Sequence, residues 1–288
     1  MKFEIQEKVQ KAPAQPPHVR QRWWGAGALA QPWLTMLADI REDAPGWLQE
    51  MLLRAGGRVM RRWFALPSVS LSSLPEYESA ASQPILDDIC LPPFVATDRH
   101  NDFAALMRLV ATRCPKVVLE LGTAHGNTVA NICRACPDAR VVTVNAPPEE
   151  ISGRSTTFAL AKDEIGRVYR RYGFSDRVVQ VWCNTLQLDL SPYLAPGSVD
   201  LAIVDACHDC KYVINDFLKA IPFIAPGGVV LLHDTHPSLS QHLVGSYGAC
   251  MILRRRGFDI RHIENTWWGI WVNRADGSDP FLRRAAVS

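Results

Sequence analysis

Short apolar runs alternate with amphipathic stretches along most of the chain from about residue 97 onward. The runs are rich in Val, Ile and Leu, as is typical of buried strands, and the stretches between them repeat their apolar positions at helical spacing. The predicted strands are Val117–Leu119, Val141–Val144, Val178–Val181, Val199–Val204, Val229–Leu232, Asp259–Ile263 and Trp268–Val272. Strands that alternate with helices predict a parallel sheet covered on both faces. The last two strands have no helix between them, which predicts an antiparallel edge.

The first helix of this region is expected to begin at Thr97, a residue that can cap a helix N-terminus. Its apolar residues Phe103, Leu106, Leu109 and Val110 fall on one face. The later helices are expected from about Asn127, over Thr156–Arg171, over Tyr212–Ala220 and over Leu239–Arg255.

The first 95 residues differ from the rest, since they hold five of the nine tryptophans and ten of the twenty prolines. Helices are predicted at 32–40 and 47–64, followed by a Ser/Pro-rich loop. Residues 1–95 are therefore predicted to form a mainly helical extension of a domain at 96–288. The tryptophans indicate burial without naming the partner, so a packed extension, a substrate lid and an element of a homodimer all stay open.

Composition changes this picture little. The chain has 288 residues, 48% hydrophobic and 21% charged, with a formal charge of +2. A net charge this small does not attract nucleic acid or an anionic membrane strongly. No apolar run is long enough to span a bilayer. The N-terminal residues lack the apolar core of a signal peptide, so we expect a cytoplasmic protein.

Two CxxC pairs occur, Cys133/Cys136 and Cys207/Cys210. The first lies late in a predicted helix near the amino edge of the sheet, and the second follows a strand at the carboxyl edge. That separation is too large for one tetrahedral zinc site, so incidental or buried thiols are expected.

An acid and a short glycine loop, Glu120-Leu121-Gly122-Thr123-Ala124-His125-Gly126, follow the first strand. Glycines let the backbone approach a ligand, and the next helix points its free N–H groups at it. A dinucleotide fingerprint has a third glycine, and its absence here makes a nicotinamide-dependent oxidoreductase a distant alternative. The E-x-G-x-x-x-G pattern resembles motif I of the class I S-adenosylmethionine (SAM) methyltransferases.

The segment from Val199 to Thr235, with its acid-ended strand, His208 and the Pro-Gly-Gly to His233-Asp234 run, resembles bacterial small-molecule O-methyltransferases. So does Lys162–Arg170, and the resemblance spans about Thr97–Asn273. It implies a Rossmann-like, doubly wound seven-stranded sheet and SAM as cofactor. The implied activity is O-methylation of a small hydroxylated metabolite or natural product, with no nucleic-acid or membrane partner. The Pro-Pro-Tyr-type motif of nucleic-acid-base and protein-amide methyltransferases is missing after Val204.

The resemblance also implies a set of cofactor-binding positions. They are Glu120, Gly122, Thr123, Ala124, Gly126, Asn127, Thr128, Asn145, Asn184, Thr185, Asp205 and Ala206. Asn145 and Asn184 stand where relatives carry acids, and an amide cannot give the charge-assisted bonds of a carboxylate. Glu149 or Glu150 is a candidate replacement, and His125 faces either the cofactor or solvent.

Asp205, His233 and Asp234 are expected to converge, because they end neighbouring parallel strands. Two carboxylates and an imidazole could hold Mg²⁺ or a borderline divalent metal. Alternatively, Asp234 caps the next helix and Asp205 only binds cofactor.

Methyl transfer also needs a base to remove one proton from the acceptor. His208 is the first candidate, followed by His233, His236 and Lys211. The two amides leave a second hypothesis open, a methyltransferase-fold protein without methyl transfer that acts as a ligand-binding partner subunit or a repurposed enzyme.

Overall fold

A computed structural model describes residues 66–71, 93–150, 160–235 and 244–274. The helices predicted at 32–40 and 47–64 lie outside the described residues, and so does nearly all of the expected 1–95 extension.

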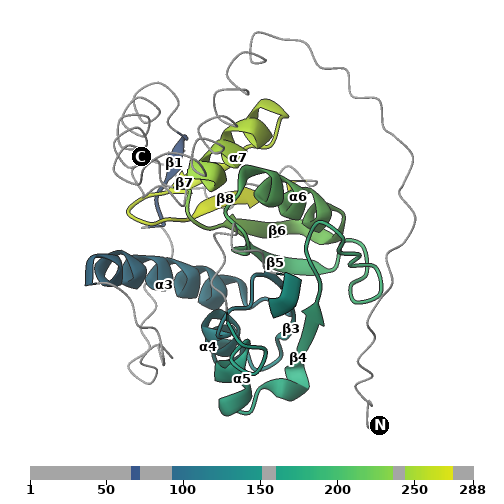
Figure 1. The fold of residues 1–288 in the computed structure, drawn as a ribbon. Helices are drawn as coiled ribbons and strands as arrows, with labels where there is room; N and C mark the ends of the chain where they lie inside the picture. The colour runs from purple at the N-terminus through teal and green to yellow at the C-terminus, as the bar shows by residue number, and fades with distance from the viewer. Residues whose placement is uncertain (1–65, 72–92, 151–159, 236–243, 275–288) are drawn as a thin grey trace, which may run out of the picture.

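The described strands form one mixed sheet in the order β1-β7-β8-β6-β5-β2-β3-β4 (Figure 1). They are β1 (Ser68–Val69), β2 (Val117–Leu121), β3 (Arg140–Asn145), β4 (Val178–Trp182), β5 (Val199–Val204), β6 (Ile224–Leu232), β7 (Arg261–Ile263) and β8 (Gly269–Val272). The prediction of a doubly wound, mostly parallel sheet is confirmed. Strand β2 lies between β5 and β3, so the order reverses beside it and opens a crevice at the carboxyl ends of these strands.

Two details of the sheet differ from expectation. The antiparallel strand is β8, and it lies between β6 and β7 instead of at an edge. An eighth strand, β1, pairs with β7 in parallel within the segment expected to be a loop. A two-residue strand carries too short a pattern to be read from periodicity.

The helices cover both faces of the sheet, as Figure 1 shows. They are α3 (Pro93–Arg113), α4 (Asn127–Ala135), α5 (Arg167–Arg171), α6 (Cys210–Ala220) and α7 (Val244–Arg255), with short 3-10 turns at Pro148–Glu150, Ser175–Arg177 and Ile221–Phe223. Helices α3, α4 and α5 pack on one face, and α6 and α7 pack on the other.

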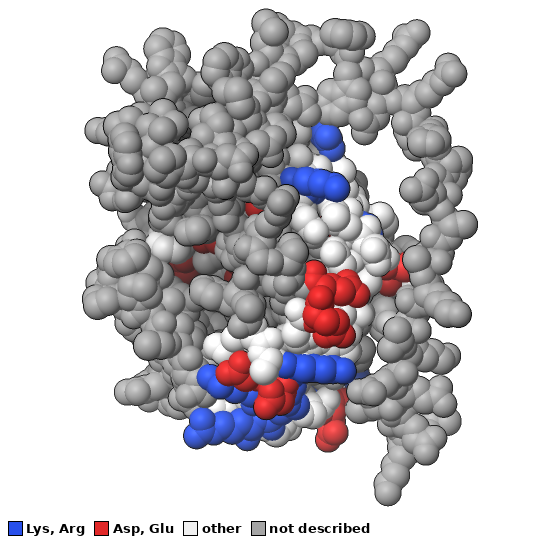
Figure 2. Space-filling model, viewed as in Figure 1, with Lys and Arg blue, Asp and Glu red and all other residues white. Residues whose placement is uncertain are grey.

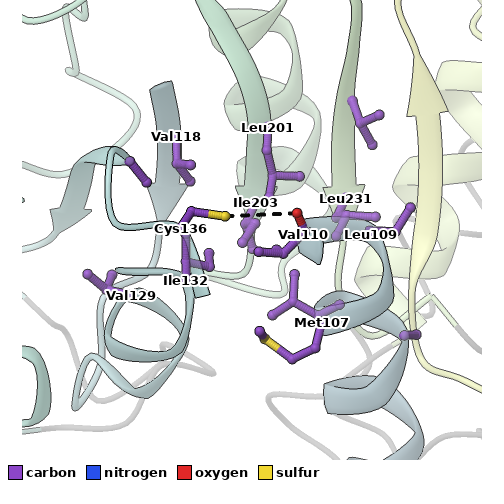
Figure 3. Close-up of a cluster of buried hydrophobic side chains, with 14 of the residues drawn as sticks. Met107, Leu109, Val110, Val118, Val129, Ile132, Cys136, Leu201, Ile203 and Leu231 are labelled. Atoms are coloured by element: carbon purple, nitrogen blue, oxygen red, sulfur yellow. Dashed lines mark hydrogen bonds between the residues drawn. The ribbon is translucent and has the colours of Figure 1, made fainter. Parts of the chain in front are cut away.

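A buried apolar cluster forms between the sheet and helices α3 and α4 (Figure 3). The side chains that point toward one another there include Met107, Leu109, Val110, Val118, Val129, Ile132, Cys136, Leu201, Ile203 and Leu231. The expected apolar face of the first helix is thus confirmed. Because both faces of β2 and β5 are covered, their residues are almost all buried, and the ends of these strands are rigid supports for a site.

Two helices differ from their predicted bounds. Helix α3 begins at Pro93, so Thr97 lies inside it and is not its cap; proline is preorganised for the first turn of a helix. Of residues 160–171, the described part of the predicted 156–171 helix, α5 covers only the end. Gly166 precedes it with φ +73° and donates its N–H to Ala124 O (2.8 Å), which takes the chain out of helical geometry.

Basic and acidic side chains lie side by side on the face drawn in Figure 2, including the region where Figure 1 places α5. No extended area of one sign occupies the described part of that face, in keeping with the formal charge of +2. Within the described ranges, no helix is both long and apolar enough to cross a membrane.

Candidate functional site

The glycine loop after β2 lies directly against the end of β5. Gly122 has φ +108°, and a Cβ built on it would lie 2.1 Å from Asp205 O. Only glycine allows this approach without strain. Backbone bonds from Asp205 N–H to Leu121 O (2.8 Å) and from Gly122 N–H to Val144 O (2.9 Å) fix the contact on both sides. The expected cofactor loop and Asp205 therefore form one continuous structure.

Asn145, at the end of β3, holds the glycine loop closed. Its Oδ1 accepts the Ala124 N–H (3.2 Å), and its Nδ2 donates to Ala146 O (2.9 Å). Asn184 similarly uses its Oδ1 to accept the Leu186 N–H (3.1 Å). The amide oxygens at both normally acidic positions thus already stabilise the backbone around the crevice.

A row of polar side chains runs beneath the glycine loop, across three adjacent strands. Thr143 Oγ1 donates to Glu120 Oε2 (2.5 Å) and also lies 2.8 Å from Thr123 Oγ1. Gln180 donates to Thr123 Oγ1 (3.0 Å) and accepts the Tyr169 hydroxyl (3.1 Å). These bonds tie the loop to β2, β3, β4 and α5.

Glu120 is neutral in this setting at pH 7. Its burial raises its pKa to about 8, and the negative charge of Asp205 acts in the same direction, against the Thr143 hydrogen bond. Glu120 therefore takes part in the site as an uncharged hydrogen-bonding group.

The segment around α5 closes the other side of the loop. Besides the Gly166 bond, Val168 N–H donates to His125 O (2.9 Å), and the Tyr169 ring lies beneath Gly126. His125 is half-buried.

Two aspartates and two histidines converge at the carboxyl ends of β5 and β6. His208 Nε2 lies 2.9 Å from Asp234 Oδ2 and 3.4 Å from Asp205 Oδ1. His233 Nδ1 lies 3.1 Å from Asp234 Oδ1 and 3.3 Å from Asp205 Oδ1. We call these four residues the Asp/His cluster. Each aspartate contacts both histidines, so the cluster forms a closed ring of charged groups.

Contacts within the cluster raise the pKa values of its histidines and lower those of its aspartates. Burial alone would lower the pKa of His208, but Asp234 and Asp205 raise it to about 9. The same two aspartates hold the pKa of His233 well above its usual range despite burial. Burial would raise the pKa of Asp205 and of Asp234, yet the histidines, His233 first, bring both below the ordinary value. At neutral pH the cluster therefore contains two carboxylates and two imidazolium rings.

His233 has a further buried partner, Asp102 of α3. Its Nε2 lies 3.0 Å from Asp102 Oδ2, and Asp102 Oδ1 accepts the Trp267 N–H (2.7 Å). The indole N–H of Trp268 donates to Asp102 O (3.0 Å), and its ring lies 4.3 Å from the His233 ring. Helix α3 and the turn before β8 are thus built into the site.

The structure brings together most of the residues expected to carry chemistry. Asp205, His208, His233 and Asp234 meet, whereas Lys211 is exposed in the first turn of α6. His236 lies outside the described residues. Asp234 has φ +58° and turns its carboxylate into the cluster.

Sequence reasoning missed Asp102 and the tryptophan pair at 267–268. The available signal was an acid on the apolar stripe of a helix, since Asp102 precedes Leu106 and Leu109 by one and two turns.

Among the described residues, the one group of side chains within metal-ligating reach is Asp205, His208 and Asp234, whose candidate ligand atoms lie within 4.8 Å of one another. It contains two of the three residues expected to bind a metal, with His208 in place of His233.

Residues 119–235 match the family model described as a methyltransferase domain. The matched stretch runs from β2 to the end of the Asp/His cluster and covers less than half of the chain. This part of the chain is therefore similar to methyltransferase domains. The expectation drawn from the glycine loop and the segment at 199–235 is confirmed. Among curated proteins, none matches the sequence.

Several solved structures are similar to this chain. The cofactor-bound protein Rv0187 from MTB is 19% identical, with a TM-score of 0.45 over 83% of this chain and 94% of its own. The SAH-bound methyltransferase PaMTH1 from Podospora anserina is 14% identical, with a TM-score of 0.45 over 88% and 99%. The SAM-bound O-methyltransferase TomG from Streptomyces achromogenes, involved in tomaymycin synthesis, is 19% identical, with a TM-score of 0.41 over 78% and 97%. At these values a structural likeness says nothing about the substrate.

Proposed function

We propose that this protein is a methyltransferase that transfers a methyl group from SAM to a hydroxyl oxygen of a small metabolite or natural product. The observation that carries the proposal is the backbone contact between the glycine loop and the Asp/His cluster, through Gly122 and Asp205. The contact supports a cofactor site directly beside groups that can bind and deprotonate a hydroxyl.

The residues around the loop fit SAM. Glycines at 122 and 126 keep the loop free of side chains, and the first turn of α4 directs N–H groups toward its outer side. When bound, SAM supplies a methyl group on a sulfonium that is already activated for transfer. The protein's part is then to align the acceptor oxygen and to take up its proton.

The Asp/His cluster also fits a divalent cation. Asp205, His208 and Asp234 offer two carboxylates and one imidazole, a donor set that suits a borderline ion better than Mg²⁺. A cation held there would replace the proton charge on His208 and lower the pKa of an acceptor hydroxyl. Exposure of the Asp205 side chain, 34% against 4% for Asp234, leaves it the member most open to an acceptor.

His208 is the base that we propose. With a pKa of about 9 it keeps its proton at neutral pH while both carboxylates face it. Once one of those contacts passes to the acceptor or a cation, the pKa of His208 falls and the ring releases its proton to solvent. The neutral ring can then take up the proton of the acceptor hydroxyl. His233 is a weaker candidate, because its Nε2 and Nδ1 both face carboxylates.

The first experiment is a calorimetric titration with S-adenosylhomocysteine (SAH), the expected product. Saturable one-site binding would support the proposal and lead to an acceptor screen with phenols, catechols and sugars, each with and without EDTA. Absence of SAH binding would refute the proposal of SAM-dependent methyl transfer.

The second experiment replaces His208 by Ala once an acceptor is found. Turnover should fall by ~100-fold or more while SAH affinity changes little, because a general base contributes roughly 10²–10⁴-fold to rate. His262→Ala is the matched control, a histidine on β7 that is not part of the cluster. If His208→Ala stays active, the base is another group.

A second candidate function is a methyltransferase fold that binds a ligand without methyl transfer. It is favoured by Asn145 and Asn184, whose oxygens are engaged by backbone N–H groups. SAH binding without turnover across the whole acceptor panel would favour this candidate.

A further inference from the structure

Asp102 lies outside the residues matched by the methyltransferase family model, yet it contacts the Asp/His cluster. It comes from α3, 131 residues before His233 in sequence. Its side chain is 6% exposed, and the side chain of His233 is 14% exposed. A carboxylate buried on the apolar face of a helix is costly unless it is fully hydrogen-bonded. Such a residue calls for a function beyond packing.

Every polar group of Asp102 that faces the site has a partner. One carboxylate oxygen accepts the Trp267 N–H, the other faces His233 Nε2, and the carbonyl oxygen accepts the Trp268 indole N–H. A carboxylate oxygen is an acceptor for a ring N–H, so the Nε2–H of His233 is the donor that faces Asp102. The opposite nitrogen, Nδ1, then faces Asp205 and Asp234.

We propose that Asp102 is a positioning residue of the active site. By accepting the Nε2–H of His233, it fixes the plane of that ring and keeps its Nδ1 edge against Asp205 and Asp234. Trp268 supports the same orientation by packing on the ring. As a consequence, α3 and the turn before β8 determine how the carboxylates of Asp205 and Asp234 converge on His233. The orientation of His233 by Asp102 does not depend on the proposed function. Only the expected effect on turnover rests on it.

A buried carboxylate that accepts one ring N–H and directs the other nitrogen at ligand groups is the arrangement that orients imidazoles beside metal ions. If Asp205, His208 and Asp234 hold a divalent cation, Asp102 would act on it indirectly, by holding the His233 ring against the two carboxylates. Loss of such a partner lowers metal affinity or activity by ~10- to 100-fold.

The test compares Asp102→Asn with Asp200→Asn. Asp200 also accepts two hydrogen bonds, from the backbone N–H groups of Lys116 (2.8 Å) and Val117 (3.0 Å), but it lies at the amino end of β5, away from the cluster. Asparagine offers one acceptor oxygen where Asp102 uses two, so either Trp267 or His233 loses its acceptor. In Asp200→Asn the single amide oxygen can still accept both bonds, because both go to Oδ2 of Asp200. The control therefore removes a carboxylate charge without touching the cluster.

The first readout is NMR of the ligand-free protein with ¹⁵N-labelled histidine, with His233 assigned by His233→Gln. We expect a slowly exchanging, downfield proton on His233 Nε2 in the wild type and in Asp200→Asn, and its loss in Asp102→Asn. Absence of this proton in the wild type would overturn the proposal, even if Asp102→Asn does not fold. Its persistence in a folded Asp102→Asn protein would do the same.

The second readout separates binding from turnover. In Asp102→Asn we expect kcat to fall ~10- to 100-fold with SAH affinity nearly unchanged, and Mn²⁺ affinity, followed by water relaxation, to fall by a similar factor. A wild type that binds neither SAH nor Mn²⁺ would contradict the proposed function, while the NMR readout would still decide the role of Asp102. Equal kcat in Asp102→Asn and Asp200→Asn would refute a positioning role.

Discussion

Glu120 offers a quantitative test of the electrostatics beneath the glycine loop. It is buried on β2, and burial raises its pKa from 4.5 to about 8. Between these pH values the folded protein keeps a proton that the unfolded chain has released. Unfolding then releases a proton, so the free energy of unfolding must fall as pH rises through this window. Below about pH 4.5 and above about pH 8 Glu120 adds no pH dependence.

The size of the effect follows from the width of the window. About 3.5 pH units separate the two values, and each unit corresponds to ~1.4 kcal/mol, which sets a ceiling of ~5 kcal/mol on the stability lost to Glu120 by pH 8. Glu120→Gln has the shape of the neutral acid and cannot ionise. It should match the wild type within ~1 kcal/mol near pH 5 and be more stable by a few kcal/mol near pH 8.5.

The assay is urea denaturation of both proteins at intervals between pH 5 and pH 8.5. The difference between the two curves cancels every other titrating group. Asp216→Asn is the control: burial raises the pKa of Asp216 only to about 6, so its difference from the wild type should stop growing above that pH. A Glu120→Gln curve parallel to the wild-type curve across the whole range would refute the assignment of a neutral Glu120.

Other predictions concern the loop and its supports. Gly122→Ala should abolish SAH binding, because its Cβ would lie 2.1 Å from Asp205 O at a φ of +108°; retained affinity by calorimetry would contradict the close contact. Asn145→Asp should tighten SAH binding by about fivefold, since a carboxylate adds a charge-assisted bond worth ~1 kcal/mol more than an amide; weaker binding would show that the amide bond to Ala146 O matters more. Tyr169→Phe should cost ~1 kcal/mol in urea denaturation, the loss of one buried hydrogen bond, with no change in SAH affinity.

The features that the sequence predicted best are those that depend on residues close together in the chain. The strand before Glu120, the turn at Gly122 and the helix from Asn127 are specified by neighbouring residues, and they lie where expected. The convergence of Asp205 with His233 and Asp234 could also be predicted, because the ends of adjacent parallel strands meet at one edge.

Features that depend on partners distant in sequence could not be predicted. Helical spacing shows that Asp102 lies on the apolar face of α3, but only the packing of that helix shows that it meets His233. The sequence predicts Gly166 inside a helix, because its bond to Ala124 O cannot be read from periodicity. For Asn145 the departure from an acid was evident, yet its use as an acceptor for the Ala124 N–H depends on the path of the loop.

Glu120 and Asp205 show that partners distant in sequence decide whether a buried acid is charged. Both acids lie beside the glycine loop, at the carboxyl ends of neighbouring strands, and their pKa values move in opposite directions. Burial and the charge of Asp205 keep Glu120 neutral, whereas His233 offsets burial for Asp205 and keeps it ionised. Two acids of one site are thereby assigned different roles by their surroundings. In the proposed function the ionised Asp205 lies at the edge where an acceptor and the sulfonium of SAM would meet, and the neutral Glu120 beneath the loop serves as a hydrogen-bonding support.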